Sequence, residues 1–250
     1  MSQKGAWLWR DLMTTQPEAA EAFYAELFGW TVKHLEMGES GIYRMFSLGE
    51  ARVGGIVTLP VSDGVPDHWV GYLGVDDVDA TVLAAPELGA VIGFGPRDIP
   101  DDGRFALIVD PQGAPVSPMT RPVDVPAPDY SPGSFCWMEL HTADIDAAIE
   151  FYADVFGWSF QEVQIADATR YALSSSGGID RGGIMQAASE GPAAWLQYVA
   201  VEDVDETANK AAELGGTVAY GPNDIPGVGR FAILSDPVGA ALAVLQPAST

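Results

Sequence analysis

Three side chains that could take part in binding or catalysis alternate along the segment CWMELHT, residues 136–142. Trp137, Glu139 and His141 are two residues apart, so in a β-strand they project from one face. The residues between them are apolar and form the better face for packing against a helix. We therefore expect Glu139 and His141 to face a cavity. There they could transfer protons, contribute two ligands to a divalent metal, or form a hydrogen-bonded pair; a solvated strand end is the remaining alternative.

The same pattern occurs 128 residues earlier, where Trp9, Asp11 and Met13 alternate. A carboxylate is costly to bury without a partner, so Asp11 and Glu139 are candidate general bases. A salt bridge to an arginine is the alternative for both acids. Trp9 and Trp137 offer flat apolar area on which an aromatic ligand could stack, or they fill the core.

Three more aromatic side chains are candidates for ligand binding. Tyr72 and Tyr198 occupy equivalent positions in predicted strands, where their hydroxyl groups could be directed at a ligand. His68 shares the strand face of Tyr72. Ordinary half-buried strand tyrosines would explain Tyr72 and Tyr198 equally well.

An arginine recurs in the segment DIP-x-x-GRF, as Arg104 and as Arg230. At the start of a strand, each guanidinium could bind a carboxylate or polarise a carbonyl group. A structural role is the alternative, in which Asp98 pairs with Arg104 and Asp224 pairs with Arg230. The prolines and the glycine of this segment predict a stiff, turning connection.

The chain contains an internal repeat. FYAELFGW at 23–30 returns as FYADVFGW at 151–158, and PRDIPDDGRFA at 96–106 returns as PNDIPGVGRFA at 222–232. Self-similarity of this length indicates two homologous domains.

A proline-rich segment separates the two copies. Its prolines disfavour both a helix and a regular strand ladder, so we expect an extended linker. The predicted organisation is a first domain at 1–122, a linker at 123–132 and a second domain at 133–250.

Each copy is itself a doubled unit. The first copy begins with a predicted strand, a helix that starts with proline and ends at Gly29, and two further strands, at 6–13, 17–28, 42–47 and 52–59. A strand, a helix ended by Gly89 and three short strands follow, at 69–75, 78–88, 91–94, 104–109 and 114–119. The second copy has the same pattern. We therefore predict an α+β protein of four βαβββ-like modules.

The composition excludes several classes of partner. Twelve Lys and Arg residues stand against 35 Asp and Glu, a formal charge of −23, so nucleic acid and anionic membrane surfaces are disfavoured. The single cysteine cannot form an intrachain disulfide, and the first residues lack the apolar core of a signal peptide. We expect a cytoplasmic protein with a small-molecule ligand, as a monomer or a homodimer.

Together these features resemble the vicinal oxygen chelate superfamily, which includes glyoxalase I, extradiol dioxygenases and bleomycin-resistance proteins. The resemblance rests on the modules, on FY-x3-FGW at the end of each first helix, and on Asp-Pro-x-Gly at 110–113 and 236–239. The repeated GP-x-DIP-x-x-GRFA segment is similar to two-domain actinobacterial glyoxalase-like proteins. The resemblance implies two half-open barrels of eight strands, with outer helices and a cavity that holds a metal in enzymes or a drug in binding proteins.

The usual metal ligands of that superfamily are not found in either copy. The positions that the resemblance implies for the three ligands hold aromatic, aliphatic or small side chains, namely Trp9, Trp137, Val70, Leu196, Ser117 and Ala243. None is an ordinary strong ligand for a divalent ion. We expect no cofactor, with a divalent metal at Glu139 and His141 as the alternative.

Three functions remain open. The first is a metal-independent protein that binds an aromatic or carbonyl-containing small molecule in a barrel cavity. The second is a lyase, isomerase or dioxygenase-type enzyme in which Glu139 and His141 transfer protons, with or without a divalent ion. The third is a regulatory or interaction protein whose cavity is vestigial. Whether the protein is an enzyme is not decided by its sequence.

Overall fold

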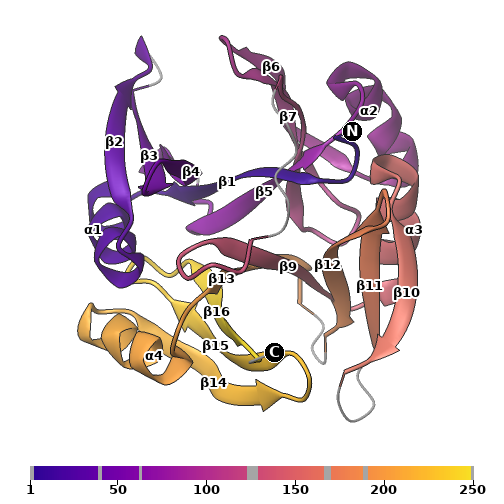
Figure 1. The fold of residues 1–250 in the computed structure, drawn as a ribbon. Coiled ribbons are helices and arrows are strands. Elements are labelled where there is room, and N and C mark those ends of the chain that lie inside the picture. The colour runs from indigo at the N-terminus through magenta and orange to yellow at the C-terminus, as the bar shows by residue number, and fades with distance from the viewer. Residues whose placement is uncertain are drawn as a thin grey trace. The chain divides into compact units, whose positions relative to one another are not determined.

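The computed structural model describes residues 3–38, 41–61, 64–122, 129–165, 170–187 and 191–248. The first half of the chain contains two modules (Figure 1). The elements of the first are β1 (Trp7–Thr14), α1 (Pro17–Phe28), β2 (Thr31–Glu36), β3 (Ile42–Leu48) and β4 (Ala51–Thr58). Those of the second are β5 (His68–Gly74), α2 (Val78–Ala84), the 3-10 helix η3 (Ala85–Leu88), β6 (Val91–Ile99), β7 (Gly103–Val109) and β8 (Pro115–Thr120).

The second half repeats this order. Its third module has β9 (Phe135–Thr142), α3 (Ile145–Phe156), β10 (Ser159–Gln164), β11 (Arg170–Ser176) and β12 (Ile179–Gln186). The fourth has β13 (Ala194–Ala200), α4 (Val204–Glu213), β14 (Thr217–Ile225), β15 (Gly229–Ser235) and β16 (Ala241–Pro247). The predicted α+β class and the four βαβββ modules are confirmed. The strand β2, directly after α1, is missing from the predicted elements of the first module.

Local sequence explains where the helices begin and end. Pro17 is the first residue of α1, where its missing N–H costs nothing, and the helix ends at Gly29 with φ +70°. The side chain of Asp144 accepts a hydrogen bond from the backbone N–H of Ala147 and caps α3. Gly157, with φ +69°, ends α3 as Gly29 ends α1.

The predicted helix at 78–88 has the observed bounds but changes type in its second half. The α-helix ends at Ala84, and Ala85–Leu88 form a 3-10 helix. Pro86 is the reason, because proline has no backbone N–H to donate within an α-helix and its ring crowds the preceding turn. In the fourth module α4 contains no proline and continues over ten residues.

The strands form two eight-stranded mixed sheets, one from each half of the sequence. Their orders are β2-β3-β4-β1-β5-β8-β7-β6 and β10-β11-β12-β9-β13-β16-β15-β14. The first strand of each module pairs in parallel with the last, for example β1 with β4. Each sheet has two edge strands, so neither forms a closed barrel.

The compact units combine modules from both halves. The first unit contains Met1–Trp9, Val70–Ala127 and Trp137–Trp195, and the second contains Arg10–Trp69, Pro128–Cys136 and Leu196–Thr250. The second and third modules thus supply most of the first unit. The first and fourth modules supply most of the second. The domain boundaries at 1–122 and 133–250 stay a prediction, and residues 123–128 of the predicted linker lie outside the described part of the chain.

A buried chain of hydrogen bonds connects the two modules within each unit. In the first unit the Trp195 indole donates to the Tyr152 hydroxyl (2.9 Å), which donates to the carboxylate of Asp110 (3.0 Å). Burial raises the pKa of Tyr152 well above its ordinary value and also raises the pKa of Asp110. The FY-x3-FGW motif therefore joins a helix to the Asp-Pro-x-Gly turn of a module from the other half.

The second unit has an equivalent chain of hydrogen bonds. The Trp69 indole donates to the Tyr24 hydroxyl (3.0 Å), which donates to the carboxylate of Asp236 (2.9 Å). Aromatic rings surround Tyr24, among them Trp30 and Phe46 at centroid distances of 6.1 Å each. Repetition of the same three residue types in both units shows that these motifs build the two cores.

The repeated DIP-x-x-GRF segment is a β-hairpin rather than a loop. Strand β6 continues to Ile99, and Asp98 lies opposite Arg104 in the antiparallel register of β6 and β7. The turn between the strands contains Asp101, whose φ is +61°. The prolines and the glycine thus shape the hairpin end, while strand pairing continues through most of the segment.

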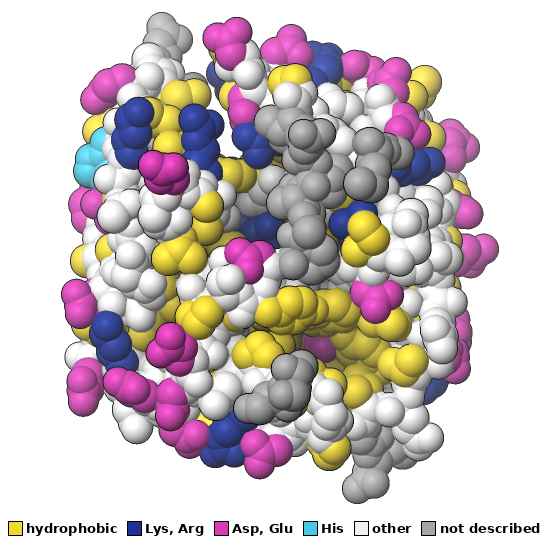
Figure 2. All heavy atoms as spheres, in the orientation of Figure 1, with side chains coloured by type: hydrophobic (Ala, Val, Ile, Leu, Met, Phe, Trp, Pro, Cys, Tyr) yellow, Lys and Arg dark blue, Asp and Glu magenta, His cyan; other side chains and the backbone are white. Residues whose placement is uncertain are grey.

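The acidic residues on the face seen in Figure 2 are dispersed. Figure 2 shows carboxylates distributed around the visible face rather than gathered in one patch. Many lie on helices, such as Asp205 and Glu206 in the first turn of α4, where they are favourable near the helix N-terminus. No helix in the described ranges is long and apolar enough to cross a membrane.

Candidate functional site

Glu139 and His141 contact each other in strand β9 of the first unit. The Nε2 atom of His141 donates to Oε1 of Glu139 at 2.7 Å. The Glu139 side chain is 11% exposed and the His141 side chain 27% exposed, so the imidazole is the more accessible partner. Met138 and Leu140 are completely buried in the core on the opposite strand face, as the alternation predicts.

An aromatic pair lies beside this acid and imidazole. The Trp137 indole donates to the Tyr171 hydroxyl at 2.9 Å, which connects β9 with β11. Gly183 makes this position available, because a Cβ atom there would overlap the hydroxyl oxygen of Tyr171. Glu139 lies opposite Gly183 in the parallel register of β9 and β12. Trp137, Glu139, His141 and Tyr171 are called the β9 cluster below.

The equivalent positions of the first half make different contacts. In the second unit the Tyr43 hydroxyl donates to Oδ1 of Asp11 at 2.7 Å, and Gly55 leaves room for it as Gly183 does for Tyr171. Asp11 is buried, with 4% of its surface exposed. Met13 stands where the second half has His141, so at these equivalent strand positions the acid is paired with an imidazole in the second copy and not in the first.

Trp9 lies in the first unit and contacts an arginine. The guanidinium carbon of Arg121 is 5.0 Å from the Trp9 ring, within the range of a cation–π interaction. Arg121 also donates to Oδ1 of Asp102 at 2.5 Å. The indole of Trp9 thus has a charged neighbour, whereas that of Trp137 has a phenol.

Tyr72 and Tyr198 are buried strand residues. The ring of Tyr72 is 5.8 Å from Phe105, and the ring of Tyr198 is 6.5 Å from Phe231. His68 is half-buried at the start of β5, and its Nδ1 donates to the carbonyl oxygen of Pro66 at 2.7 Å. The contacts of Tyr72 and Tyr198 are compatible both with core packing and with ligand binding.

Arg104 and Arg230 each pair with two carboxylates. Arg104 donates two hydrogen bonds of 2.8 Å to Asp79 of α2 and one of 2.8 Å to Asp98, so the expected pair with Asp98 is present. Hydrogen bonds to Arg104 lower the pKa of Asp79. Arg230 donates to Asp205 and Asp224 in the same way. Any ligand bound by either arginine would compete with two carboxylates already in place.

Tyr43 and Tyr171 were not among the residues predicted to form the site. Both are retained at equivalent positions of the repeat, and each is followed twelve residues later by the second glycine of a Gly-Gly pair. That combination is a usable signal, because a glycine in a strand can accommodate a side chain that crosses it. Repetition of the tyrosine and the glycine at one spacing indicates a contact between them.

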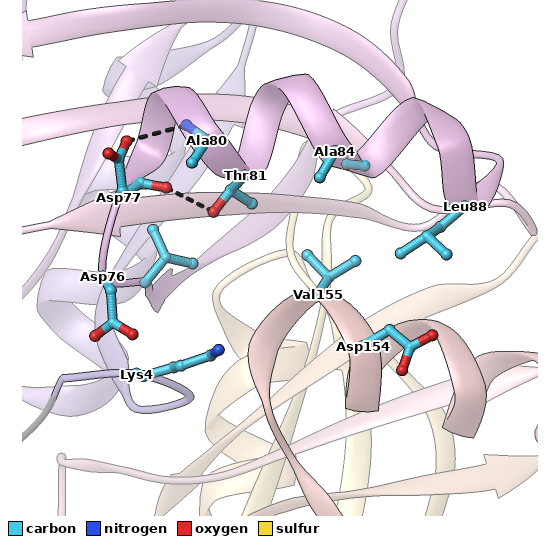
Figure 3. Close-up of a pocket in the computed structure, with 11 residues that line it drawn as sticks. Lys4, Asp76, Asp77, Ala80, Thr81, Ala84, Leu88, Asp154 and Val155 are labelled. Carbon is cyan, nitrogen blue, oxygen red and sulfur yellow. Dashed lines mark hydrogen bonds between the residues drawn. The ribbon is translucent and has the colours of Figure 1, made fainter.

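A separate pocket of about 250 Å³ lies beside α2 and α3 in the first unit (Figure 3). Apolar side chains such as Leu88 and Val155 line it together with Lys4, Asp76 and Asp154, and no residue of the β9 cluster is among them. In the second unit Lys210 replaces Ala84, donates to the carbonyl oxygen of Glu26 at 2.5 Å and lies 3.4 Å from its carboxylate. The pocket therefore marks a place where the first unit lacks a long side chain between helices.

Comparison with known proteins establishes the family. The model of the Glyoxalase/Bleomycin resistance protein/Dioxygenase superfamily matches residues 9–117 and 135–244. The chain belongs to this superfamily. It is 40% identical over 246 residues to the protein named "Putative glyoxylase CFP32" of Mycobacterium tuberculosis, covering 96% of this chain and 94% of that one. The expected resemblance to glyoxalase-like proteins is confirmed.

Two further proteins are similar to the chain, one in sequence over about half its length and the other in structure over most of it. "Anthracycline biosynthesis protein DnrV" of Streptomyces peucetius is 31% identical over 130 residues, 46% of this chain and 47% of that protein. The Mn(II)-bound glyoxalase from Novosphingobium aromaticivorans has a TM-score of 0.64 at 18% identity, covering 98% of this chain and 83% of that one. The structural likeness shows the fold alone.

The residues at the expected metal positions do not fit a divalent ion. Tyr72 pairs with Ser117 and Tyr198 pairs with Ala243 in the parallel registers where the last ligand would lie. Val70 is completely buried and offers no donor atom. The described residues contain no group of three or more His, Cys, Asp or Glu side chains arranged to hold a metal. The donor set of this chain therefore differs from the oxygen and imidazole set that such ions require.

Proposed function

We propose that this superfamily member binds a small aromatic or carbonyl-containing molecule at the β9 cluster and needs no metal triad to do so. One observation carries the proposal. The buried carboxylate of Glu139 accepts a hydrogen bond from the more exposed imidazole of His141, directly beside the Trp137–Tyr171 pair. A polar pair next to flat aromatic surface is the arrangement by which pockets orient small ligands.

Each member of the cluster has a distinct part in binding. Glu139 holds Nε2 of His141, which leaves Nδ1 as the ring nitrogen able to exchange a hydrogen bond with a ligand oxygen. The indole of Trp137 provides area for stacking, and its bond to Tyr171 restricts its orientation. A preorganised ring loses little freedom on binding, which favours affinity.

Relatives support the aromatic class of ligand. The name of DnrV places it in anthracycline biosynthesis, and the segment that it shares with this chain covers about one copy of the repeat. Anthracyclines contain fused rings and ketone groups, so one molecule presents both features that the β9 cluster could recognise. The glyoxylase name of the mycobacterial relative supports a small carbonyl compound instead.

A second function follows from the same pair of side chains. A carboxylate that holds an imidazole can stabilise the positive charge that the ring gains when it removes a proton. Glu139 and His141 could therefore isomerise a substrate by moving a proton next to a carbonyl group. This chemistry needs no metal ion, in keeping with the donor set.

Titration of tryptophan fluorescence tests the proposal. The probes are an anthracycline and the hemithioacetal of methylglyoxal, and the variants are Trp137→Phe and His141→Met. Methionine occupies the equivalent position of the first half, so we expect His141→Met to be accommodated by the fold. We expect saturable quenching by at least one probe and a loss of affinity of about tenfold or more in both variants. Trp9→Phe, which alters the equivalent residue, is the control and should retain affinity.

The outcomes separate the two functions. Binding without turnover supports a binding protein, whereas turnover that Glu139→Gln abolishes while binding persists supports proton transfer. Absence of saturable binding by either probe, or equal affinity in the wild type and in Trp137→Phe, would contradict a ligand site at the β9 cluster.

A further inference from the structure

Arg10 in strand β1 lacks the carboxylate partner that most buried or half-buried arginines of the described ranges have, and half-buried Arg181 of the first unit is the other exception. Arg44 pairs with Glu18 and Glu21, and Arg121 pairs with Asp102. No ion pair involves Arg10 within the described ranges, and its buried Nε atom has no hydrogen-bond partner there. The chain has 35 acidic residues available, so this absence of a carboxylate partner requires a physical reason.

The contacts of Arg10 do not neutralise its charge. The guanidinium carbon is 5.2 Å from the centroid of the Phe135 ring. The nearby thiol of Cys136 is buried, and burial raises its pKa to about 12, so it is neutral at physiological pH. Loss of solvent lowers the pKa of Arg10 to about 10, which still leaves the guanidinium charged. A positive charge is thus held among an aromatic ring and a neutral thiol.

Gln197 in strand β13 is a second unpaired group of the same unit. Its side chain is completely buried, and neither the oxygen nor the nitrogen of its amide has a hydrogen-bond partner in the described structure. A buried amide without partners is unfavourable by itself. Within the described ranges, Arg10 and Gln197 are the two residues of the second unit that have buried side-chain atoms without a hydrogen-bond partner.

Comparison of the two copies of the repeat indicates that the side chains of Arg10 and Gln197 point towards each other. Gly71 is the residue equivalent to Gln197, and a Cβ atom on it would overlap the ring of Trp7 and lie 2.8 Å from the terminal methyl group of Met138. The residues equivalent to Trp7 and Met138 are Phe135 and Arg10. The side chain of Gln197 therefore extends towards Phe135 and Arg10. At the positions where the first unit has Met138 and Gly71, the second unit has the guanidinium of Arg10 and the amide of Gln197.

We propose that the second unit binds a small carboxylate anion between Arg10 and Gln197. The Nε–H of Arg10 and the amide nitrogen of Gln197 both donate, and carboxylate oxygens accept such bonds in the planar geometry that guanidinium groups favour. The ligand must be of the size of formate or acetate, because Gln197 is completely buried. The site is separate from the β9 cluster, whose residues belong to the first unit.

Thermal unfolding at constant ionic strength tests this site. The protein is dialysed against a buffer in which gluconate is the only anion, and formate, acetate or chloride then replaces gluconate. Binding to the folded state should raise Tm saturably, by about 5 to 11 °C when formate or acetate reaches about 100 times its Kd. Chloride serves to distinguish a carboxylate site from one that accepts any small anion, and a larger response to chloride would overturn the carboxylate assignment.

Two variants make the test specific. Arg10→Met introduces the residue that the first unit has at the equivalent position, and it should abolish the response to formate. In gluconate its Tm should exceed that of the wild type, because the unpaired charge has been removed. Arg170→Gln changes an exposed arginine that pairs with Asp146 and Glu162, and it should retain the full response.

A crystal structure of the wild type grown in formate provides a second measurement that does not depend on the variants. Density for a planar three-atom anion in hydrogen-bonding distance of Arg10 Nε is expected. A water molecule there, an empty site, or an equal rise of Tm in the wild type and in Arg10→Met would overturn the proposal.

Discussion

Removal of one hydroxyl group from the buried chain of the first unit should destabilise the protein strongly. Tyr152→Phe deletes the oxygen that donates to Asp110 at 3.0 Å and accepts from the Trp195 indole at 2.9 Å. The ring remains, so no large cavity forms. The Trp195 N–H and one Asp110 oxygen lose this partner, although the other Asp110 oxygen still accepts from the backbone N–H groups of Gln112 and Ala114.

The expected loss follows from the number of groups that lose a partner. Each buried polar group left without a partner costs about 1–3 kcal/mol, so with two such groups we expect the free energy of unfolding to fall by about 2–6 kcal/mol. Urea denaturation at pH 7 and 25 °C, analysed by linear extrapolation, measures this difference. Tyr24→Phe should cost a similar amount, since Tyr24 makes equivalent bonds of 2.9 and 3.0 Å.

A surface tyrosine provides the control. Tyr220 is 55% exposed, and Tyr220→Phe should change the free energy of unfolding by less than about 0.5 kcal/mol. Losses below about 1 kcal/mol in both Tyr152→Phe and Tyr24→Phe would refute the view that these hydrogen bonds stabilise the two cores.

Two further predictions concern the glycine beside the β9 cluster and the buried aspartate. Gly183→Ala should lower the free energy of unfolding by about 1–3 kcal/mol in urea, because the new Cβ atom would overlap a tyrosine hydroxyl. Gly191→Ala, where a Cβ atom meets nothing within 4 Å, should change it by less than about 0.5 kcal/mol, and equal effects would contradict the overlap. Burial raises the pKa of Asp110 above 3.8, so its contribution to stability is complete below pH 3.8 and is lost as pH rises through the folded pKa. The advantage of the wild type over Asp110→Asn should therefore shrink as pH increases in a urea series, and a constant difference would count against a raised pKa.

Local features of the sequence predict the modules well. Proline at the start of α1 and glycines at the ends of α1 and α3 act within one turn of helix, so their effects need no knowledge of the rest of the chain. Strand alternation correctly places Met138 and Leu140 in the core. Pro86 was overlooked in the same local pattern, and it accounts for the break after α2.

The pairing of modules could not be predicted, because the two copies carry the same motifs. Tyr24 could in principle bond Asp110 of its own half or Asp236 of the other, and the residue types are identical in both cases. Only the folded chain shows that Tyr24 bonds Asp236. Repetition thus reveals the elements of a fold while it hides which copy contacts which.

Only the residues of the candidate site that lie on one strand, β9, could be predicted from the sequence. Glu139 and His141 are two residues apart, so their shared face follows from strand geometry alone. Tyr171 comes from β11, and its contact with Trp137 depends on the order of strands in the sheet. The second carboxylate on Arg104 was missed for the same reason, since Asp79 lies on a helix while Asp98 lies across a hairpin.

The exchange of modules between the halves makes one chain resemble a dimer whose two subunits exchange modules and are joined in one polypeptide. Each half gives a tyrosine to the other half and receives an aspartate-bearing turn from it, as the bonds of Tyr24 with Asp236 and of Tyr152 with Asp110 show. A single copy would therefore leave both groups without partners until a second copy supplied them. Duplication of a gene for such a dimer would place both copies in one polypeptide. Afterwards the sequence of each copy could change independently. His141 of the β9 cluster and Arg10 of the second unit are two such differences between the copies.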